Sequence, residues 1–225
     1  MYSNCWKKGT QSVQILALIA HPSRGSFNHA ILDRCLASLR GHEVIVHDLY
    51  AETFDPVFPE ADIRRRCSFD PVIQRHMRDL SSSQGLIVIH PDWWGQPPAI
   101  LKGWLDRVLT PGVAYEYQGP EFGTKHAVPL LNHVRAAVFV TSDALASQVA
   151  PLFDAIWRDR VFSFCGIESR RIELLERMRE TNRRQREQYL CRVDAVMNDL
   201  VGRSKETNRS EETNETYSGR PAREE

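Results

Sequence analysis

The sequence has no excess of charge of either sign, and it lacks the apolar segments that mark secreted or membrane proteins. Among 225 residues, Lys and Arg total 29, and Asp and Glu also total 29. This balance disfavours nucleic acid or an anionic membrane as the main partner, since both attract a basic excess. The longest apolar run near the start, residues 13–20, is too short to cross a bilayer, and no signal-peptide core precedes it. We therefore expect neither secretion nor membrane insertion.

Metal-binding and disulfide patterns are missing as well. The five cysteines form no CxxC pair, and their odd number fits free thiols in a reducing compartment. The eight histidines show neither HxxxH nor HExxH spacing, so the sequence predicts no metal site. We accordingly expect a cytoplasmic location.

Three common enzyme motifs are also absent from the sequence. It contains no GxGxxG dinucleotide motif, no GxxxxGK[ST] phosphate loop and no GxSxG nucleophile turn. These absences disfavour an ordinary Rossmann dehydrogenase, a nucleoside triphosphatase and an α/β-hydrolase.

What the sequence does contain is a regular alternation of short apolar runs and amphipathic segments. We expect strands at 14–20, 43–47, 86–89, 136–140 and 170–175, and helices near 31–39, 72–80, 97–109, 149–162 and 182–201. This alternation predicts one doubly wound α/β domain over residues 13–202, with a five-stranded parallel sheet of order 2-1-3-4-5 and helices on both faces. Ligands of such a sheet bind beyond the carboxyl ends of its strands. Residues 1–12 and 203–225 are expected to be disordered tails.

The loop after the first expected strand offers donors for an anion. In residues 21–28, Ser26 lies near a helix start, where free backbone N–H groups and the helix dipole attract a phosphate. The alternative is that Ser26 is only a helix cap, because serine is a favoured residue there.

The stretch 90–104 is the most distinctive part of the sequence. A strand ends at His90, two tryptophans and Gly95 follow, and Pro97-Pro98 opens a helix. A flat aromatic wall beside free backbone amides suits a planar ring such as the isoalloxazine of a flavin. Alternatively, Trp93 and Trp94 are loop aromatics that pack against a neighbouring subunit.

These motifs together resemble those of a known family. Residues 91–95 (PDWWG) and 98–108 (PAILKGWLDRV), with His21, residues 26–28 (SFN), 114–117 (AYEY) and Thr141-Ser142, resemble the NAD(P)H:quinone oxidoreductase family of flavodoxin-like flavoproteins, also called the flavodoxin-2 group. The resemblance covers about residues 13–166 in consistent order.

The resemblance implies a flavin site on three loops. The residues expected to bind the flavin phosphate and ribityl chain are His21, Ser26, Phe27 and Asn28. Those expected along the isoalloxazine are Pro91, Asp92, Trp93, Trp94 and Gly95, chiefly through the backbone, with Thr141, Ser142 and Asp143 at its other edge. Tyr115 and Tyr117 would lie over or beside the ring, in a substrate pocket at a homodimer interface.

Three departures from the family pattern bear on the cofactor. Residues 141–144 read TSDA where several members have Thr-Thr-Gly-Gly, and the Tyr…His pair of the long, FAD-binding members has no counterpart. The region between the second and third strands is short. These features are more similar to the compact members, so FMN is the expected cofactor and FAD the second choice, with NAD(P)H as co-substrate.

The resemblance implies reduction of a quinone, or of a related electrophilic acceptor, by ping-pong hydride transfer. Tyr115 and Tyr117 are the candidate catalytic residues, although packing at an interface would account equally well for either. The Arg-rich segment 177–186 is interpreted as a solvated face, with contact to the cofactor phosphate as the alternative. Two other functions stay open: an electron-carrier flavoprotein, and an accessory subunit of a potassium-efflux antiporter.

Overall fold

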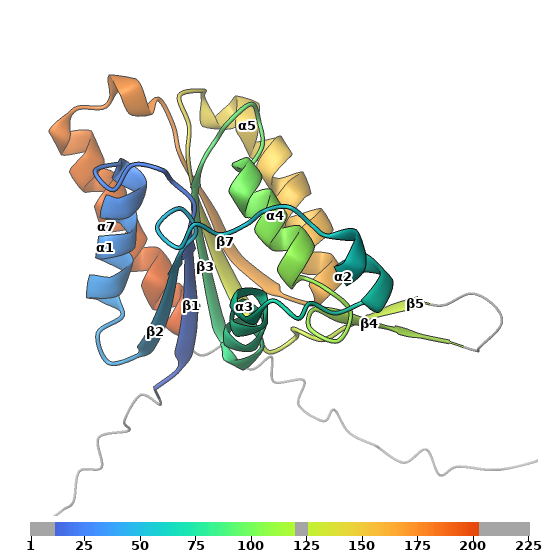
Figure 1. Cartoon of the computed structure of the whole chain (residues 1–225). Helices are drawn as coiled ribbons and strands as arrows, with labels where there is room; N and C mark the ends of the chain where they lie inside the picture. Colours follow the sequence, from blue (N-terminus) through green and yellow to red (C-terminus); the bar gives the residue numbers. More distant parts are fainter. Residues whose placement is uncertain (1–11, 120–125, 203–225) are drawn as a thin grey trace, which may run out of the picture.

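The described chain forms a parallel five-stranded sheet with helices on both faces (Figure 1). The structure is a computed structural model that describes residues 12–119 and 126–202. The strands are β1 (Gln14–Ile19), β2 (Glu43–Asp48), β3 (Gly85–Pro91), β6 (Arg135–Thr141) and β7 (Glu168–Leu175). Their order, β2-β1-β3-β6-β7, confirms the predicted topology. Apart from Ser12, the two predicted tails lie outside the described residues.

The helices divide between the two faces of the sheet. Helices α1 (Phe27–Ser38) and α7 (Arg183–Val201) cover one face. Helices α3 (Pro71–Ser82), α4 (Ala99–Val108) and α5 (Ala146–Phe153), with a π-type continuation over Asp154–Phe162, cover the other. The remaining elements are α2 (Glu60–Arg65), α6 (Ser163–Cys165), a 3-10 turn over Met178–Glu180, and the antiparallel pair β4 (Tyr115–Gln118) and β5 (His126–Pro129).

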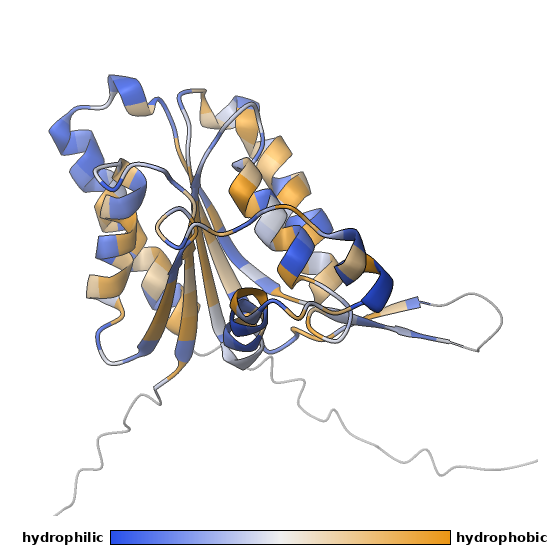
Figure 2. Ribbon diagram, viewed as in Figure 1, coloured by the Kyte–Doolittle hydropathy of each residue, from blue (hydrophilic) through white to orange (hydrophobic). Residues whose placement is uncertain are grey.

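The central strands are apolar on both sides, as the continuous hydrophobic runs predicted (Figure 2). In β1, Leu16 and Leu18 pack under α3 and α4, whereas Ile15, Ala17 and Ile19 pack under α1 and α7. These two clusters are separated only by the sheet, so the strand ends are held at fixed positions relative to one another. None of the helices among the described residues is long and apolar enough to span a membrane.

Helix α4 is fixed by the motif that carried the family resemblance. A Cβ on Gly103 would lie 2.3 Å from the Cβ of Pro56, so only glycine allows this close approach. The buried guanidinium of Arg107 donates to the carbonyl oxygen of Asp55 at 2.7 Å and forms ion pairs with Asp62 and Asp70. The motif therefore anchors the segment before α3 to α4, and the start of α4 is thereby held at the carboxyl edge of the sheet.

Candidate functional site

Three loops meet at the carboxyl edge of the sheet, after β1, β3 and β6 (Figure 1). The chain passes from β1 to one neighbour, β2, and returns to the other, β3, so the edge between β1 and β3 is a topological switch point. Ligands of open α/β sheets bind at such points, because the loops separate there and leave a crevice.

The first loop is joined to the third through buried side chains. Ser26 caps α1, its Oγ accepting the backbone N–H of His29 at 3.4 Å. Asn28, which is buried, donates from Nδ2 to Oγ1 of Thr141 at 2.9 Å. Ser26 is therefore the N-cap of α1, and this role is compatible with an anion site because Ser26 also lines a surface hollow.

Asp92 joins the second loop to the third. Its Oδ1 accepts the backbone N–H of Gly95 at 2.8 Å, and its Oδ2 accepts the hydroxyl of Ser142 at 2.8 Å. Its own N–H donates to the carbonyl oxygen of Thr141 at 2.7 Å. One carboxylate therefore fixes both loops. The N–H of Gly95, which was expected to face the ligand, is occupied by this carboxylate.

Residues Trp93 to Gln96 form a tight turn. The N–H of Trp93 donates to the carbonyl oxygen of Gln96 at 3.0 Å, and the N–H of Gln96 donates to the carbonyl oxygen of Trp93 at 3.2 Å. Trp94 and Gly95 have φ values of 60° and 72°, as in a type I′ turn. The Trp94 side chain is 100% exposed, and that of Trp93 is 41% exposed. The turn thus presents an aromatic surface to solvent at the expense of strain at Trp94.

A hollow of about 250 Å³ opens beside the N-terminus of α1. Its lining residues are His21, Ser26, Phe27, Asn28, Thr141, Met178, Arg179 and Arg186. The last three belong to the segment after β7. Because Leu175 of β7 pairs in register with Thr141 of β6, this segment begins beside the third loop. The predicted order of the strands places the end of β7 beside the end of β6, and this order could have assigned Arg179 and Arg186 to the site.

The two arginines of the hollow are held in different ways. Arg179 forms an ion pair with Asp143, from Nε to Oδ2 at 2.8 Å. Arg186 donates from Nε to the Thr181 hydroxyl at 2.9 Å, and its guanidinium lies 5.8 Å from the centre of the Phe27 ring. Together with Ser26 they give the hollow a donor set suited to a phosphate.

His21 lies at the same hollow, in its uncharged form. Partial burial lowers the pKa of His21, and the neighbouring His29 lowers it further. Nδ1 of His21 lies 3.1 Å from both the backbone nitrogen and the carbonyl oxygen of Ser23, so this contact fixes the orientation of the ring and is compatible with either tautomer.

Tyr115 and Tyr117 lie away from these loops within the same chain. Helix α4 runs from the second loop to the amino edge of the sheet, and β4 and β5 follow there, just before β6 begins (Figure 1). Tyr115 contacts the ring of Phe164, with 4.8 Å between ring centres. Partial burial and the neighbouring Tyr117 raise the pKa of Tyr115, so its hydroxyl stays protonated. The structure therefore does not bring the two tyrosines to the site of their own chain.

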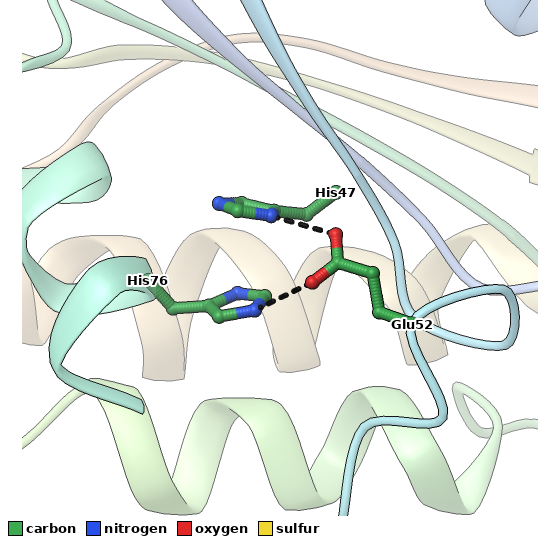
Figure 3. Close-up of side chains that lie close together, drawn as sticks. All are labelled: His47, Glu52 and His76. Carbon is green, nitrogen blue, oxygen red and sulfur yellow. Dashed lines mark hydrogen bonds and ion pairs between the residues drawn. The ribbon is translucent and has the colours of Figure 1, made fainter. Parts of the chain in front are cut away.

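A second polar cluster, which the sequence did not predict, lies between β2, α3 and α4 (Figure 3). Nδ1 of His47 is 2.8 Å from Oε1 of Glu52, and Nε2 of His76 is 3.1 Å from Oε2 of the same carboxylate. The possible ligand atoms of the three residues lie within 4.8 Å of one another, close enough to share a metal ion, but Trp104 donates its indole N–H to Nδ1 of His76 at 3.0 Å. His76 must then carry its proton on Nε2, the nitrogen that a metal would need, and Arg75 also pairs with Glu52. The cluster fits a hydrogen-bonded brace better than a metal centre.

The fold and the three joined loops define a flavodoxin-like protein whose candidate ligand site lies at the switch point of the sheet. The model of a protein family with a flavodoxin-like fold matches residues 13–197 of this chain. With the relatives described below, this match shows that the chain belongs to the NAD(P)H:quinone oxidoreductase family of flavodoxin-like proteins.

Three known proteins illustrate the relationship. The NAD(P)H dehydrogenase (quinone) 1 of Cavia porcellus is 34% identical over 139 residues, 50% of this chain and 50% of that protein. An uncharacterized NAD(P)H oxidoreductase of Haemophilus influenzae is 30% identical over 169 residues, 71% of this chain and 81% of that protein. The solved NAD(P)H:quinone oxidoreductase of Methanothermobacter marburgensis has a TM-score of 0.74 at 24% identity, over 86% of this chain and all of that one. The chain spans about half the length of the mammalian quinone dehydrogenases that it matches.

Proposed function

We propose that the protein is a flavin-dependent NAD(P)H oxidoreductase that reduces quinones or related electrophilic acceptors. The observation that carries this proposal is the meeting of a phosphate-type hollow and an exposed aromatic turn at the switch point of the sheet. In flavodoxin-like sheets this is the position of FMN. The relatives named as NAD(P)H quinone dehydrogenases support the activity.

The residues present fit a phosphorylated flavin. Ser26 and the first N–H groups of α1 provide neutral donors, and Arg179 and Arg186 provide charge. FMN is the favoured cofactor because its single phosphate matches this one hollow, with FAD second.

When bound, the flavin supplies the group that accepts hydride from NAD(P)H and passes reducing equivalents to the acceptor. The polypeptide itself would hold the flavin in position. Asp92 holds the turn at Trp94 against the third loop, so the planar ring would lie against a fixed surface. The fully exposed Trp94 ring offers an apolar face to a flat acceptor.

We further propose that the active form is a homodimer. Tyr115 and Tyr117 stand at the amino edge of the sheet, so they can serve a flavin site only if that site belongs to another subunit. The exposed side chains of Tyr117, Leu130 and Phe164 give this region an apolar surface that a partner would cover.

The proposal is tested on the purified full-length chain. We expect a yellow protein that releases FMN on heating, identified by chromatography, and that oxidises NADH or NADPH with menadione at a rate well above that of free FMN. A colourless protein that neither flavin reconstitutes would contradict the flavin site. A flavin-loaded protein with no turnover above free FMN would instead indicate an electron carrier.

A further inference from the structure

Ser26, at the wall of the hollow, and two side chains behind it are connected by hydrogen bonds. Oγ of Ser26 lies 3.1 Å from Nδ1 of His29, and Nε2 of His29 lies 3.2 Å from Oδ2 of Asp48. His29 and Asp48 are largely buried, with 14% and 19% of their side chains exposed. Asp48 is itself fixed, because its Oδ1 accepts the backbone N–H of Ala51 at 3.1 Å. Ser26 is the member that faces the hollow.

The direction of these bonds depends on the protonation of His29. A carboxylate only accepts hydrogen bonds, so neutral His29 carries its proton on Nε2, toward Asp48. Its Nδ1 then has a lone pair, and the Ser26 hydroxyl donates to it. In that state the hydroxyl proton of Ser26 is directed away from the hollow and cannot bind an anion.

Protonation of His29 reverses the bond to Ser26. The new Nδ1–H donates to Oγ of Ser26, and the hydroxyl proton becomes free to point into the hollow. Both ring nitrogens of His29 then donate hydrogen bonds, one to Ser26 and one to Asp48, and the carboxylate of Asp48 balances the positive charge of His29. A bound phosphate dianion would accept the Ser26 hydroxyl through a charge-assisted bond.

We propose that Asp48, His29 and Ser26 form a relay that takes up one proton from solvent when the flavin phosphate binds. This inference rests on the proposed flavin site and assigns His29 and Asp48, which do not line the hollow, as positioning residues for the phosphate. Within residues 12–119 and 126–202, the titratable side chains in contact with His29 are Asp48, from the end of β2, and His21, from the loop after β1, with 6.4 Å between the imidazole centres. Across the hollow, Arg179 and Arg186 add positive charge, which favours the dianion.

The test compares FMN with riboflavin, which has the same ring and no phosphate. Binding is measured by titration calorimetry at about pH 7.5, where the free phosphate is mostly a dianion because its second pKa is about 6. Repeating the titration in buffers of different ionisation enthalpy gives the number of protons taken up. We expect net uptake with FMN and none with riboflavin.

The variants His29→Gln and Asp48→Asn separate the relay from the rest of the site. We expect each to abolish the uptake and to weaken FMN binding by about tenfold or more, with riboflavin binding unchanged. The matched control is His133→Gln, because His133 is exposed and bonds to the Ser81 carbonyl, away from the site. Equal loss of FMN and riboflavin binding would indicate a structural role and overturn the relay.

Failure of the relay is distinguishable from failure of the flavin site. A wild-type protein that binds FMN without proton uptake, or a His29→Gln variant with unchanged uptake, would overturn the relay alone. A wild-type protein that binds neither flavin would remove the proposed function and the relay together.

Discussion

Trp94 has a backbone conformation that residues with a β-carbon seldom adopt. Its φ of 60° lies in the left-handed region, which costs about 1–2 kcal/mol for an L-residue other than glycine. Its side chain is 100% exposed and recovers none of this cost by packing within the chain. An exposed, strained tryptophan at the proposed ligand site is explained more readily by function than by stability.

Replacing Trp94 should therefore separate stability from activity. We expect Trp94→Gly to raise the free energy of unfolding by about 1 kcal/mol, because glycine adopts positive φ without strain. Quinone turnover should fall, since the aromatic surface is lost. Urea unfolding and steady-state kinetics measure the two effects.

Trp93 provides the matched control, since it precedes Trp94 in the turn and has no positive φ. Trp93→Gly should lower the free energy of unfolding, because its side chain is partly buried and its backbone gains nothing from glycine. A Trp94→Gly variant less stable than wild type would contradict the strain argument.

At the residue scale, the sequence predicted that the loops after the first, third and fourth parallel strands form one site, but it did not predict the bonds between their residues. Asn28 and Thr141 meet because β1 and β6 both flank β3, and the loop after β3 bonds to the loop after β6 through Asp92. The brace of His47, Glu52 and His76 could not be predicted, since its residues come from a strand, a loop and a helix with no fixed spacing. The roles of individual residues in binding the flavin stay predictions.

At the scale of elements, the long apolar and amphipathic segments were the most predictable. All five parallel strands and their order are confirmed. The helix expected at 149–162 begins earlier, at Ala146, and becomes π-type after Phe153; Pro151 lies in its α-helical part. Strands β4 and β5 were not predicted, because each has only four residues and neither contains a fully buried side chain, so no clear alternation of apolar and polar residues marks them. Helix α2, six residues with none buried, was missed for a similar reason.

The position of β4 leads to a prediction about mixed dimers. We expect a dimer of one Tyr115→Ala/Tyr117→Ala subunit and one Asn28→Ala subunit to recover up to about half of wild-type activity, since one site would keep both intact parts. Each parent homodimer should be strongly impaired. Co-expression with two affinity tags isolates the mixed form for NADH–menadione kinetics.

The mixed dimer gives opposite results for the two arrangements of the tyrosines. If the tyrosines acted within their own chain, both sites of the mixed dimer would carry a defect and no activity would return. A mixed dimer as inactive as its parents would therefore contradict a shared site. Matched Phe substitutions at both tyrosines control for loss of the rings, since they remove only the hydroxyls.

For the molecule as a whole, two buried histidines make stability depend on pH. Burial lowers the pKa of His90 to about 4, and burial with the neighbouring His47 lowers the pKa of His76 to about 4. His90 is held neutral between the Pro91 carbonyl, at 2.8 Å, and the indole N–H of Trp157, at 3.1 Å. In the unfolded chain the ordinary pKa of 6.5 applies.

The direction of this pH dependence follows from proton binding. Between pH 6.5 and about 4 the unfolded chain binds more protons than the folded one, so the free energy of unfolding falls as the pH falls. Each histidine contributes on the order of 2 kcal/mol across this window. Urea unfolding at a series of pH values should show the loss beginning near pH 6.5.

The variant His90→Gln tests the contribution of one histidine. Glutamine can also donate to a carbonyl and accept from an indole, but it does not titrate. We expect a shallower fall in stability from pH 6.5 downward than in wild type, whereas His133→Gln, at an exposed position, should follow the wild-type curve. An unchanged slope in His90→Gln would show that His90 binds its proton equally in both states.

The exposure of Trp94 also gives the molecule an optical property. Trp104 and Trp157 are enclosed in the apolar core, whereas the Trp94 indole stands entirely in water at the edge of the proposed flavin site. Its fluorescence should thus be emitted at longer wavelength than that of the two enclosed indoles and be accessible to dissolved quenchers. A flavin bound at that edge would quench this emission by energy transfer, so the tryptophan emission spectrum would change when flavin binds. The fluorescence of Trp94 would therefore report whether the proposed flavin site is occupied.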